Sequence, residues 1–188
     1  MSYIQRRRFL WILFLVGIVL IAVVANATTL TRLKLEDLAL ESTAVARLRC
    51  LGATSQWERG EIWTETRFEV LQQEKGSLPA IVIVRLLGGR VGHLWSNVDE
   101  VPQFRPGEEV YLFLWSAGGQ SYSVLGWSQG TLRIGKDPQT GVEMVTQDSA
   151  ARSVFDPQAR AFRRGGIRNM PIELFRARLH RAMRRENP

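Results

Sequence analysis

The sequence predicts a mainly β protein, a small antiparallel barrel or sandwich with an N-terminal export or anchor helix and a C-terminal amphipathic helix. Three observations support this fold class. Six short β-type segments follow one another with turns roughly every 8 to 20 residues and with no βαβ rhythm. An uncharged apolar run stands near the start, and apolar residues at helical spacing stand near the end.

The N-terminal region has the layout of a secretory signal. Residues 6–8 are arginines, residues 9–24 are apolar, and residues 25–27 (Ala-Asn-Ala) match the small-x-small pattern that signal peptidase requires. Cleavage after Ala27 is the favoured interpretation. An uncleaved anchor at residues 9–25 is the alternative, although this run reaches only about 24 Å as a helix. Either way the arginines stay in the cytoplasm, and the rest is exported to the periplasm or the cell exterior.

The net charge of +7, from 25 basic and 18 acidic residues, is divided unevenly along the chain. Residues 151–188 carry ten arginines and three acids, whereas residues 28–150 are net negative. Because only the two ends are basic, a body that grips polyanions is excluded, and nucleic acid is not an expected partner. The single cysteine, Cys50, excludes a disulfide framework and a Cys-based zinc cluster, and no cofactor is predicted.

Four segments are predicted. Residues 1–27 form the signal peptide or anchor, residues 28–43 the leader helix, residues 44–150 the β-barrel domain, and residues 151–188 a basic linker with an amphipathic helix. Leucines at positions 33, 35, 38 and 40, with acids between them, indicate the leader helix.

Apolar runs and turn residues locate the strands. Residues 44–51 predict the first strand and residues 55–60 a hairpin tip, after which residues 62–70 alternate between a buried and a wet face. Residues 80–87 are a nearly continuous Val/Ile/Leu run, which predicts a strand buried on both faces or closing a barrel. A glycine-rich bend at residues 88–92 follows. Later strands are expected at residues 110–115, 122–126 and 130–134, which makes six, and residues 142–145 are a candidate for one more edge strand. The β pattern should stop near residue 150.

The last segment predicts an amphipathic helix. Residues 163–166 indicate a flexible basic linker, and Asn169 followed by Pro171 indicates a helix start. Apolar side chains at positions 172, 175, 179 and 183 share one face. The favoured interpretation is that this face docks on the barrel. The alternative is contact with an anionic membrane surface or an acidic partner through five arginines: Arg176, Arg178, Arg181, Arg184 and Arg185.

A frame of motifs resembles a family of uncharacterised exported bacterial β-domain proteins. Residues 84–92 match "V-R-x-x-G-G-x-x-G", residues 104–114 match "F-x-x-G-E-E-V-x-L-F-L", and residues 126–130 match "G-x-x-Q-G". Together with Trp57 and a Lys-Gly pair at residues 75–76, these pieces cover roughly half the chain. The resemblance implies no known activity.

The order of strand, hairpin, Lys-Gly turn and buried strand also resembles, more distantly, the OB-fold barrel of netrin-like and TIMP-like modules. This resemblance implies an OB-like barrel, and as an alternative function a protease inhibitor or protease-associated module. In TIMP-like inhibitors an N-terminal cysteine chelates the protease zinc. Thr28 stands at the predicted mature N-terminus, so that mechanism is not expected here.

Few residues are candidates for catalysis. His93 is interpreted as a turn residue, and the minor alternative is a His-dependent hydrolase in which Asp99 or Glu100 supplies the acid. The chain contains no G-x-S-x-G elbow, H-E-x-x-H pair or phosphate loop. No catalytic residue or metal ligand is therefore predicted. Cys50 is interpreted as a packed core residue.

Two tryptophans have polar neighbours and are expected to be exposed. Trp57, Trp95 and His93 form the predicted binding surface, suited to a protein or glycan of the cell envelope. The sequence thus favours an exported, non-enzymatic binding or interaction module.

Overall fold

The computed structural model describes residues 31–116 and 121–184, all within one compact unit, Thr31–Pro188. The predicted export helix, its cleavage site and the anchor at residues 9–25 lie outside the described residues. In the part that is described, neither helix has the length and apolar content needed to span a membrane.

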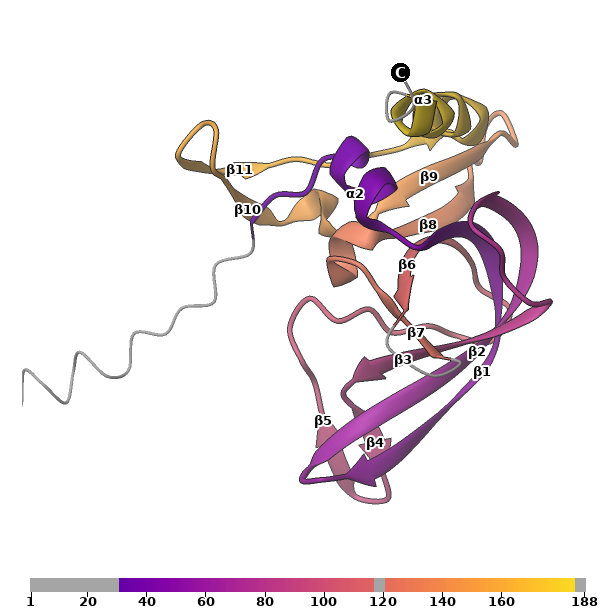
Figure 1. The fold of residues 1–188 in the computed structure, drawn as a ribbon, viewed down its shortest axis with the longest axis vertical. Coiled ribbons are helices and arrows are strands. Elements are labelled where there is room, and N and C mark those ends of the chain that lie inside the picture. The colour runs from indigo at the N-terminus through magenta and orange to yellow at the C-terminus, as the bar shows by residue number, and fades with distance from the viewer. Residues whose placement is uncertain (1–30, 117–120, 185–188) are drawn as a thin grey trace, which may run out of the picture. The chain divides into compact units, whose positions relative to one another are not determined.

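The described chain is mainly β, as predicted, with an α-helix near each end (Figure 1). The leader helix is confirmed as α2 (Leu35–Glu41), and the C-terminal helix as α3 (Ile172–Arg184). Two short 3₁₀ helices are η1 (Trp127–Gly130) and η2 (Asp148–Ala151). The strands are β1 (Ala44–Glu58), β2 (Glu61–Lys75), β3 (Ile81–Leu87), β4 (Gly89–Val91), β5 (Leu94–Ser96), β6 (Glu109–Ser116), β7 (Ser121–Val124), β8 (Thr131–Lys136), β9 (Glu143–Gln147), β10 (Ser153–Asp156), β11 (Ala161–Arg164) and β12 (Met170–Pro171).

Five strands are linked in a cycle by their pairings. β1 pairs with β2, β2 with β3, β3 with β7, β7 with β6, and β6 again with β1. The β3–β7 pair is parallel and the other four are antiparallel. β8, β9 and β12 extend the sheet beyond β6, while β4–β5 and β10–β11 form separate hairpins.

Two cores lie on opposite faces of β1 and β6. The inner core is lined by side chains that face into the cycle, including Phe68, Val84 and Leu112. The outer core lies where α2 and α3 pack against β1, β6, β8 and β9, and it includes Leu38 and Phe175. The prediction that the C-terminal helix docks is confirmed, because its apolar face is buried in this outer core.

For residues 80–87 the first of the two predicted alternatives, burial on both faces, is wrong. They form β3, but only Val82, Val84 and Leu86 are buried, and Ile81 on the other face is 45% exposed. No helix of the described chain covers that face. β6, in contrast, is buried on both faces, because α2 and α3 cover its outer side.

The prediction that the β pattern stops near residue 150 is also wrong. β10 and β11 form a hairpin, and Arg163 and Arg164 belong to β11 and not to a flexible linker. β12 then pairs with the edge of β9, so α3 begins at Ile172 and not at Asn169. These strands are two to four residues long and partly charged, so they lack the apolar alternation that reveals a strand in sequence.

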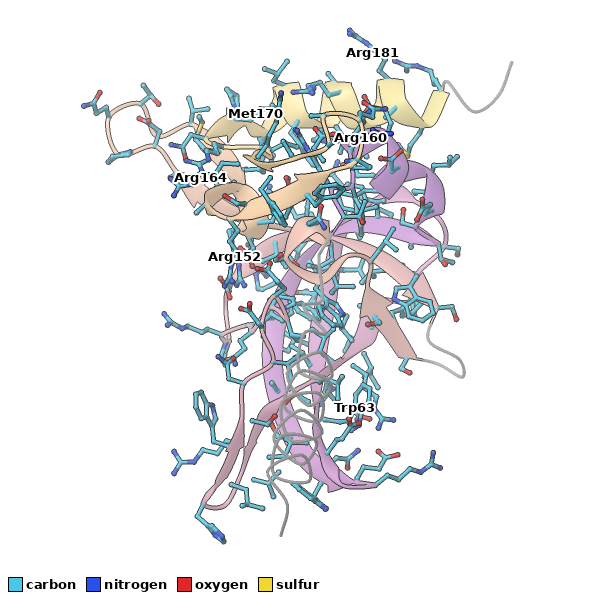
Figure 2. All side chains as sticks on the ribbon, turned by 90° about the vertical axis from the view of Figure 1, so that its left-hand side faces the viewer. Trp63, Arg152, Arg160, Arg164, Met170 and Arg181 are labelled. Carbon is cyan, nitrogen blue, oxygen red and sulfur yellow. The ribbon has the colours of Figure 1, made fainter. Side chains whose placement is uncertain are left out.

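Basic side chains of the C-terminal segment lie toward one part of this unit. Figure 2 shows Arg152, Arg160, Arg164 and Arg181 in the half that holds α3, and Trp63 toward the opposite end. The basic tail noted in the sequence therefore becomes a basic region of the folded unit.

Candidate functional site

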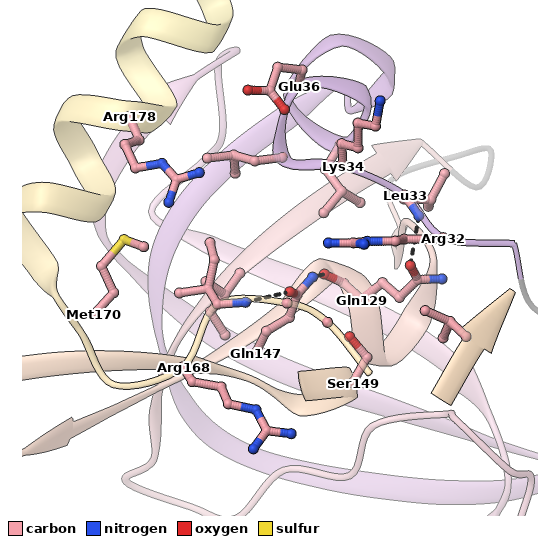
Figure 3. A pocket seen from close by; sticks show the side chains of 17 residues that line it. Arg32, Leu33, Lys34, Glu36, Gln129, Gln147, Ser149, Arg168, Met170 and Arg178 are labelled. Atoms are coloured by element: carbon pink, nitrogen blue, oxygen red, sulfur yellow. Dashed lines mark hydrogen bonds between the residues drawn. The ribbon is translucent and has the colours of Figure 1, made fainter. Parts of the chain in front are cut away.

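A cleft of about 400 Å³ lies where α2, α3 and the chain between β11 and β12 meet (Figure 3). Residues 32–36 and Leu38 form one wall, and residues 165–168 with Met170 and Arg178 form the facing wall. Gln129, Leu132, Gln147, Ser149 and Val154 complete the lining. Segments far apart in the chain thus build a single concave site.

Two buried glutamines hold these walls in place. The Oε1 atom of Gln129 accepts the backbone N–H of Leu33 at 2.8 Å, and its Nε2 donates to the carbonyl oxygen of Thr31 at 3.0 Å. The Oε1 atom of Gln147 accepts the N–H of Ile167 at 3.1 Å, and its Nε2 donates to the carbonyl oxygen of Gln129. Because these amide groups bond to the protein itself, they give the cleft its shape.

Four cations and one acid line the cleft: Arg32, Lys34, Arg168, Arg178 and Glu36. Two of the cations bond to neutral oxygens. The Nζ atom of Lys34 donates to the amide oxygen of Gln158 at 3.0 Å, and the Nε atom of Arg168 donates to the carbonyl oxygen of Ala150 at 2.8 Å. These bonds orient the cations without neutralising them.

Arg178 has no side-chain hydrogen bond or ion pair with another described residue. Arg32 has a carboxylate partner, since its Nη1 atom donates to Oδ2 of Asp156 at 3.4 Å. In Figure 3 the side chains of Arg32 and Arg178 extend toward one another from opposite walls. Two guanidinium groups thus face a common space.

Asp156 neutralises the charge of Arg32 only in part, because the Asp156 carboxylate is shared among several donors. The backbone N–H of Ala159 lowers the pKa of Asp156 most, burial opposes this, and the N–H of Gln158 and the guanidinium groups of Arg32 and Arg163 lower it further. The carboxylate is held ionised, but it faces two arginines at once.

Gly165 leaves room for the guanidinium group of Arg32. A Cβ atom at this position would lie 2.9 Å from Cζ of Arg32, closer than side-chain carbons pack. Glycine therefore lets the guanidinium group lie flat against the backbone of the facing wall.

The lining has the chemistry of an anion site. Guanidinium groups donate paired hydrogen bonds to carboxylates and phosphates, and a concave site focuses their field. The lining contains no histidine or cysteine, and no group of three or more His, Cys, Asp or Glu suited to a metal ion occurs in the described ranges.

The predicted surface of Trp57, His93 and Trp95 is only partly assembled. His93 lies in the turn between β4 and β5, as predicted, and lines an open groove of about 600 Å³ with Arg90, Trp95 and Gln103. The exposure predicted for both tryptophans is confirmed, at 55% for Trp57 and 68% for Trp95.

Trp57 does not line this groove, and the strand register explains why. Trp57 shares a face of β1 with Ser55, which packs against Gly89 of β4. Trp95 is paired with Arg90, the residue that follows Gly89. Because successive residues of a strand point to opposite faces, Trp95 lies on the face of the β4–β5 hairpin opposite to Ser55. The two tryptophans lie on different sides of that hairpin.

The structure does not pair His93 with a nearby acid. Asp99 and Glu100 both lie 2.8 Å from Nη1 of Arg152, and Glu100 also accepts the hydroxyl of Ser128. The His93 side chain has no hydrogen bond or ion pair within the described chain. Cys50 is buried as expected, and burial raises the pKa of its thiol.

The predicted arginine surface of the C-terminal helix is divided among several environments. Arg178 lines the cleft, while Arg181 lines a smaller hollow beside it and Arg184 is exposed. Arg176 bonds to the buried carboxylate of Glu74 at 3.0 Å. Arg185 lies outside the described residues.

Two groupings were not predicted from the sequence. One is the cleft, whose Arg32, Lys34 and Arg168 look like ordinary solvated charges in the chain. The other is Glu74, whose carboxylate accepts hydrogen bonds from Tyr111 at 3.2 Å and from Arg176, and contacts Nε2 of His180 at 2.5 Å. Both depend on contacts between distant segments, and no local pattern signals them.

Searches of known protein families, curated proteins and solved structures find no significant match to this chain. The resemblance to exported bacterial β-domain proteins and to OB-fold modules therefore stays a prediction.

Proposed function

We propose that this chain is an exported, non-enzymatic binding module of the cell envelope, and that its ligand carries an anionic group that lies in the cleft. The observation that carries the proposal is an excess of positive charge in the cleft. Four cations and one acid line the cleft, and Arg178 has no side-chain partner among the described residues. A partly enclosed site screens charges less than open water does, so an anion gains more there than on the surface.

The size and lining of the cleft indicate the ligand class. A volume of about 400 Å³ suits a small molecule or the end of a larger chain. Arg32 and Arg178 would bind a phosphate or carboxylate, and Leu33, Ile167 and Met170 would contact the uncharged part. A protein or glycan partner would present such an acidic group to the cleft.

The lining supports binding and not catalysis. Ser149 is the only hydroxyl in the lining, and it is 3% exposed. No histidine lines the cleft, so Ser149 lacks the adjacent base that would activate it as a nucleophile.

We also propose that the five-strand cycle is an OB-like barrel. One parallel pair, β3–β7, among antiparallel pairs and a single inner core within the cycle both support this assignment. An experimental structure in which β3 and β7 are not hydrogen-bonded to one another would contradict it.

Calorimetric titration of the full chain with inorganic phosphate, glycerol 3-phosphate and citrate tests the proposed function. We expect at least one probe to bind, and the variants Arg32→Gln and Arg178→Gln to weaken that binding about tenfold or more, since each removes a charged hydrogen-bond donor.

Arg184→Gln is the matched control, because Arg184 is an exposed arginine of the same helix that does not line the cleft. It should bind as the unaltered chain does. The proposal fails if none of the three probes binds, or if Arg184→Gln weakens binding as much as Arg178→Gln.

A further inference from the structure

The β10–β11 hairpin presents an aromatic and basic outer face. Phe155 is paired with Phe162, and Ser153 with Arg164, so these four side chains share one face of the hairpin. The two rings meet edge to face with their centroids 5.5 Å apart, and Phe162 is 64% exposed. The opposite face carries the buried Val154, which lines the cleft.

Positive charge on this outer face and in the hairpin turn is unpaired. The side chains of Arg164, on the outer face, and of Arg160, in the turn, are exposed and make no hydrogen bond or ion pair within the described residues. The one acid of the two strands, Asp156, alternates to the other face and already contacts Arg32. An exposed ring beside uncompensated arginines is typical of surfaces that bind anionic lipid.

The hairpin also contacts the first described residues of the chain. Thr31 forms a parallel bridge with Phe155, and the N–H of Arg32 donates to the carbonyl oxygen of Phe155 at 2.9 Å. The uncharged run of residues 9–25 ends six residues before Thr31, a length that reaches at most about 20 Å. In the alternative in which residues 9–25 remain as an anchor, the length of the connecting chain keeps the bilayer within this reach of Thr31.

From these observations we propose that the outer face of the β10–β11 hairpin rests on a membrane surface that contains anionic phospholipid. Phe155 and Phe162 contact the boundary between headgroups and acyl chains, and Arg160 and Arg164 bind headgroup phosphates. This role is separate from ligand binding in the cleft, and it belongs to this hairpin and not to α3.

Hydrogen–deuterium exchange of the full chain in lipid nanodiscs tests the proposal. One set of discs contains phosphatidylcholine alone, and the other contains phosphatidylcholine mixed with phosphatidylglycerol. We expect the amides of residues 153–164 to exchange roughly fivefold more slowly in the anionic discs. Added salt should reduce the difference, because the attraction is partly screened.

The double variant Phe162→Ser with Arg164→Gln should lose this protection. Its matched control is Trp57→Ser with Arg59→Gln, which removes an exposed aromatic ring and an exposed arginine at the same spacing from the β1–β2 hairpin. The control should keep the protection of residues 153–164.

Four results would overturn the proposal. They are failure of the chain to associate with the anionic discs, equal exchange of residues 153–164 in both kinds of disc, protection that survives in the double variant, and protection that appears on α3 and not on the hairpin. The last result would assign lipid contact to the helix arginines.

Discussion

β3 and β6 are both apolar strands, but only β6 is buried on both faces. In β3 the side chains of Val82, Val84 and Leu86 fill the inner core, while Ile81 and its face remain partly in contact with solvent. In β6 the alternate residues Tyr111 and Phe113 are also buried, against α2 and α3. Burial of a strand's second face thus depends on a covering element from elsewhere in the chain, and not on the strand's own sequence.

The uncovered side of β3 is stabilised by charged groups. The guanidinium group of Arg85 lies 4.7 Å from the ring centroid of Trp63 on the neighbouring strand, and it pairs with Glu58. These contacts let an apolar strand keep a solvated face without a helix over it.

The two glutamates Glu69 and Glu74 of β2 show the same contrast. The Glu74 side chain is 2% exposed and bonds to residues of α3 and β6, whereas the Glu69 side chain is 45% exposed and pairs with Arg49. Residues five positions apart on one strand thus meet different dielectric environments, because α3 covers only one of them.

The largest expected effect comes from truncating one outer-face side chain on β6 and one on β3. Phe113→Ala should lower the free energy of unfolding by about 3–5 kcal/mol, because it leaves a cavity between β6 and the helices. Ile83→Ala, on the half-exposed face of β3, should cost about 1 kcal/mol or less. Urea unfolding of both variants measures the difference, and similar losses would show that the two faces are equally buried.

Removing one carboxylate charge at each glutamate has the next largest effect. Glu74→Gln should destabilise the protein by about 3 kcal/mol, because Arg176 and Tyr111 would lose their charged partner in a buried site. Glu69→Gln should cost at most about 1 kcal/mol, since exposed ion pairs contribute little. Thermal unfolding monitored by circular dichroism compares them, and equal shifts would mean that α3 does not seal the Glu74 site.

The loss of stability at acidic pH is the smallest of the three expected effects. Burial alone would raise the pKa of Glu109, but Arg47 and Arg49 lower it below its ordinary value of 4.5, and Arg47 likewise lowers the pKa of Glu143. A lowered folded-state pKa means that these groups stabilise the fold fully above about pH 4.5, and that this contribution is lost as the pH falls through their folded-state values.

Arg47→Gln should therefore flatten the loss of stability below pH 4.5 while costing at most about 1 kcal/mol at pH 7, since these side chains remain partly exposed. Arg67→Gln is the control, because Arg67 is exposed on β2 and makes no side-chain ion pair among described residues. Urea unfolding at pH 3 to 7 measures the slopes. A slope unchanged in Arg47→Gln would contradict the role of this network.

The sequence by itself determined the mainly β class, the leader helix, the amphipathic C-terminal helix and the exposure of Trp57 and Trp95. These features depend on local periodicity and on the polarity of neighbouring residues, and both can be read within a single segment of the chain. The same patterns do not identify what covers an apolar face. For that reason burial on both faces, one of the two alternatives for residues 80–87, is found in β6 and not in β3.

Only the tertiary structure decided where the cleft lies and which charged side chains face one another in it. Arg32, Arg168 and Arg178 are separated by more than a hundred positions at the extremes, and each looks like a solvated surface charge in its own segment. Hydrogen bonds from Gln129 and Gln147 bring those segments together. Local patterning sets which side of a segment is apolar, but long-range packing sets which charges face one another, because Coulomb interactions depend on distance in space and not on separation along the chain.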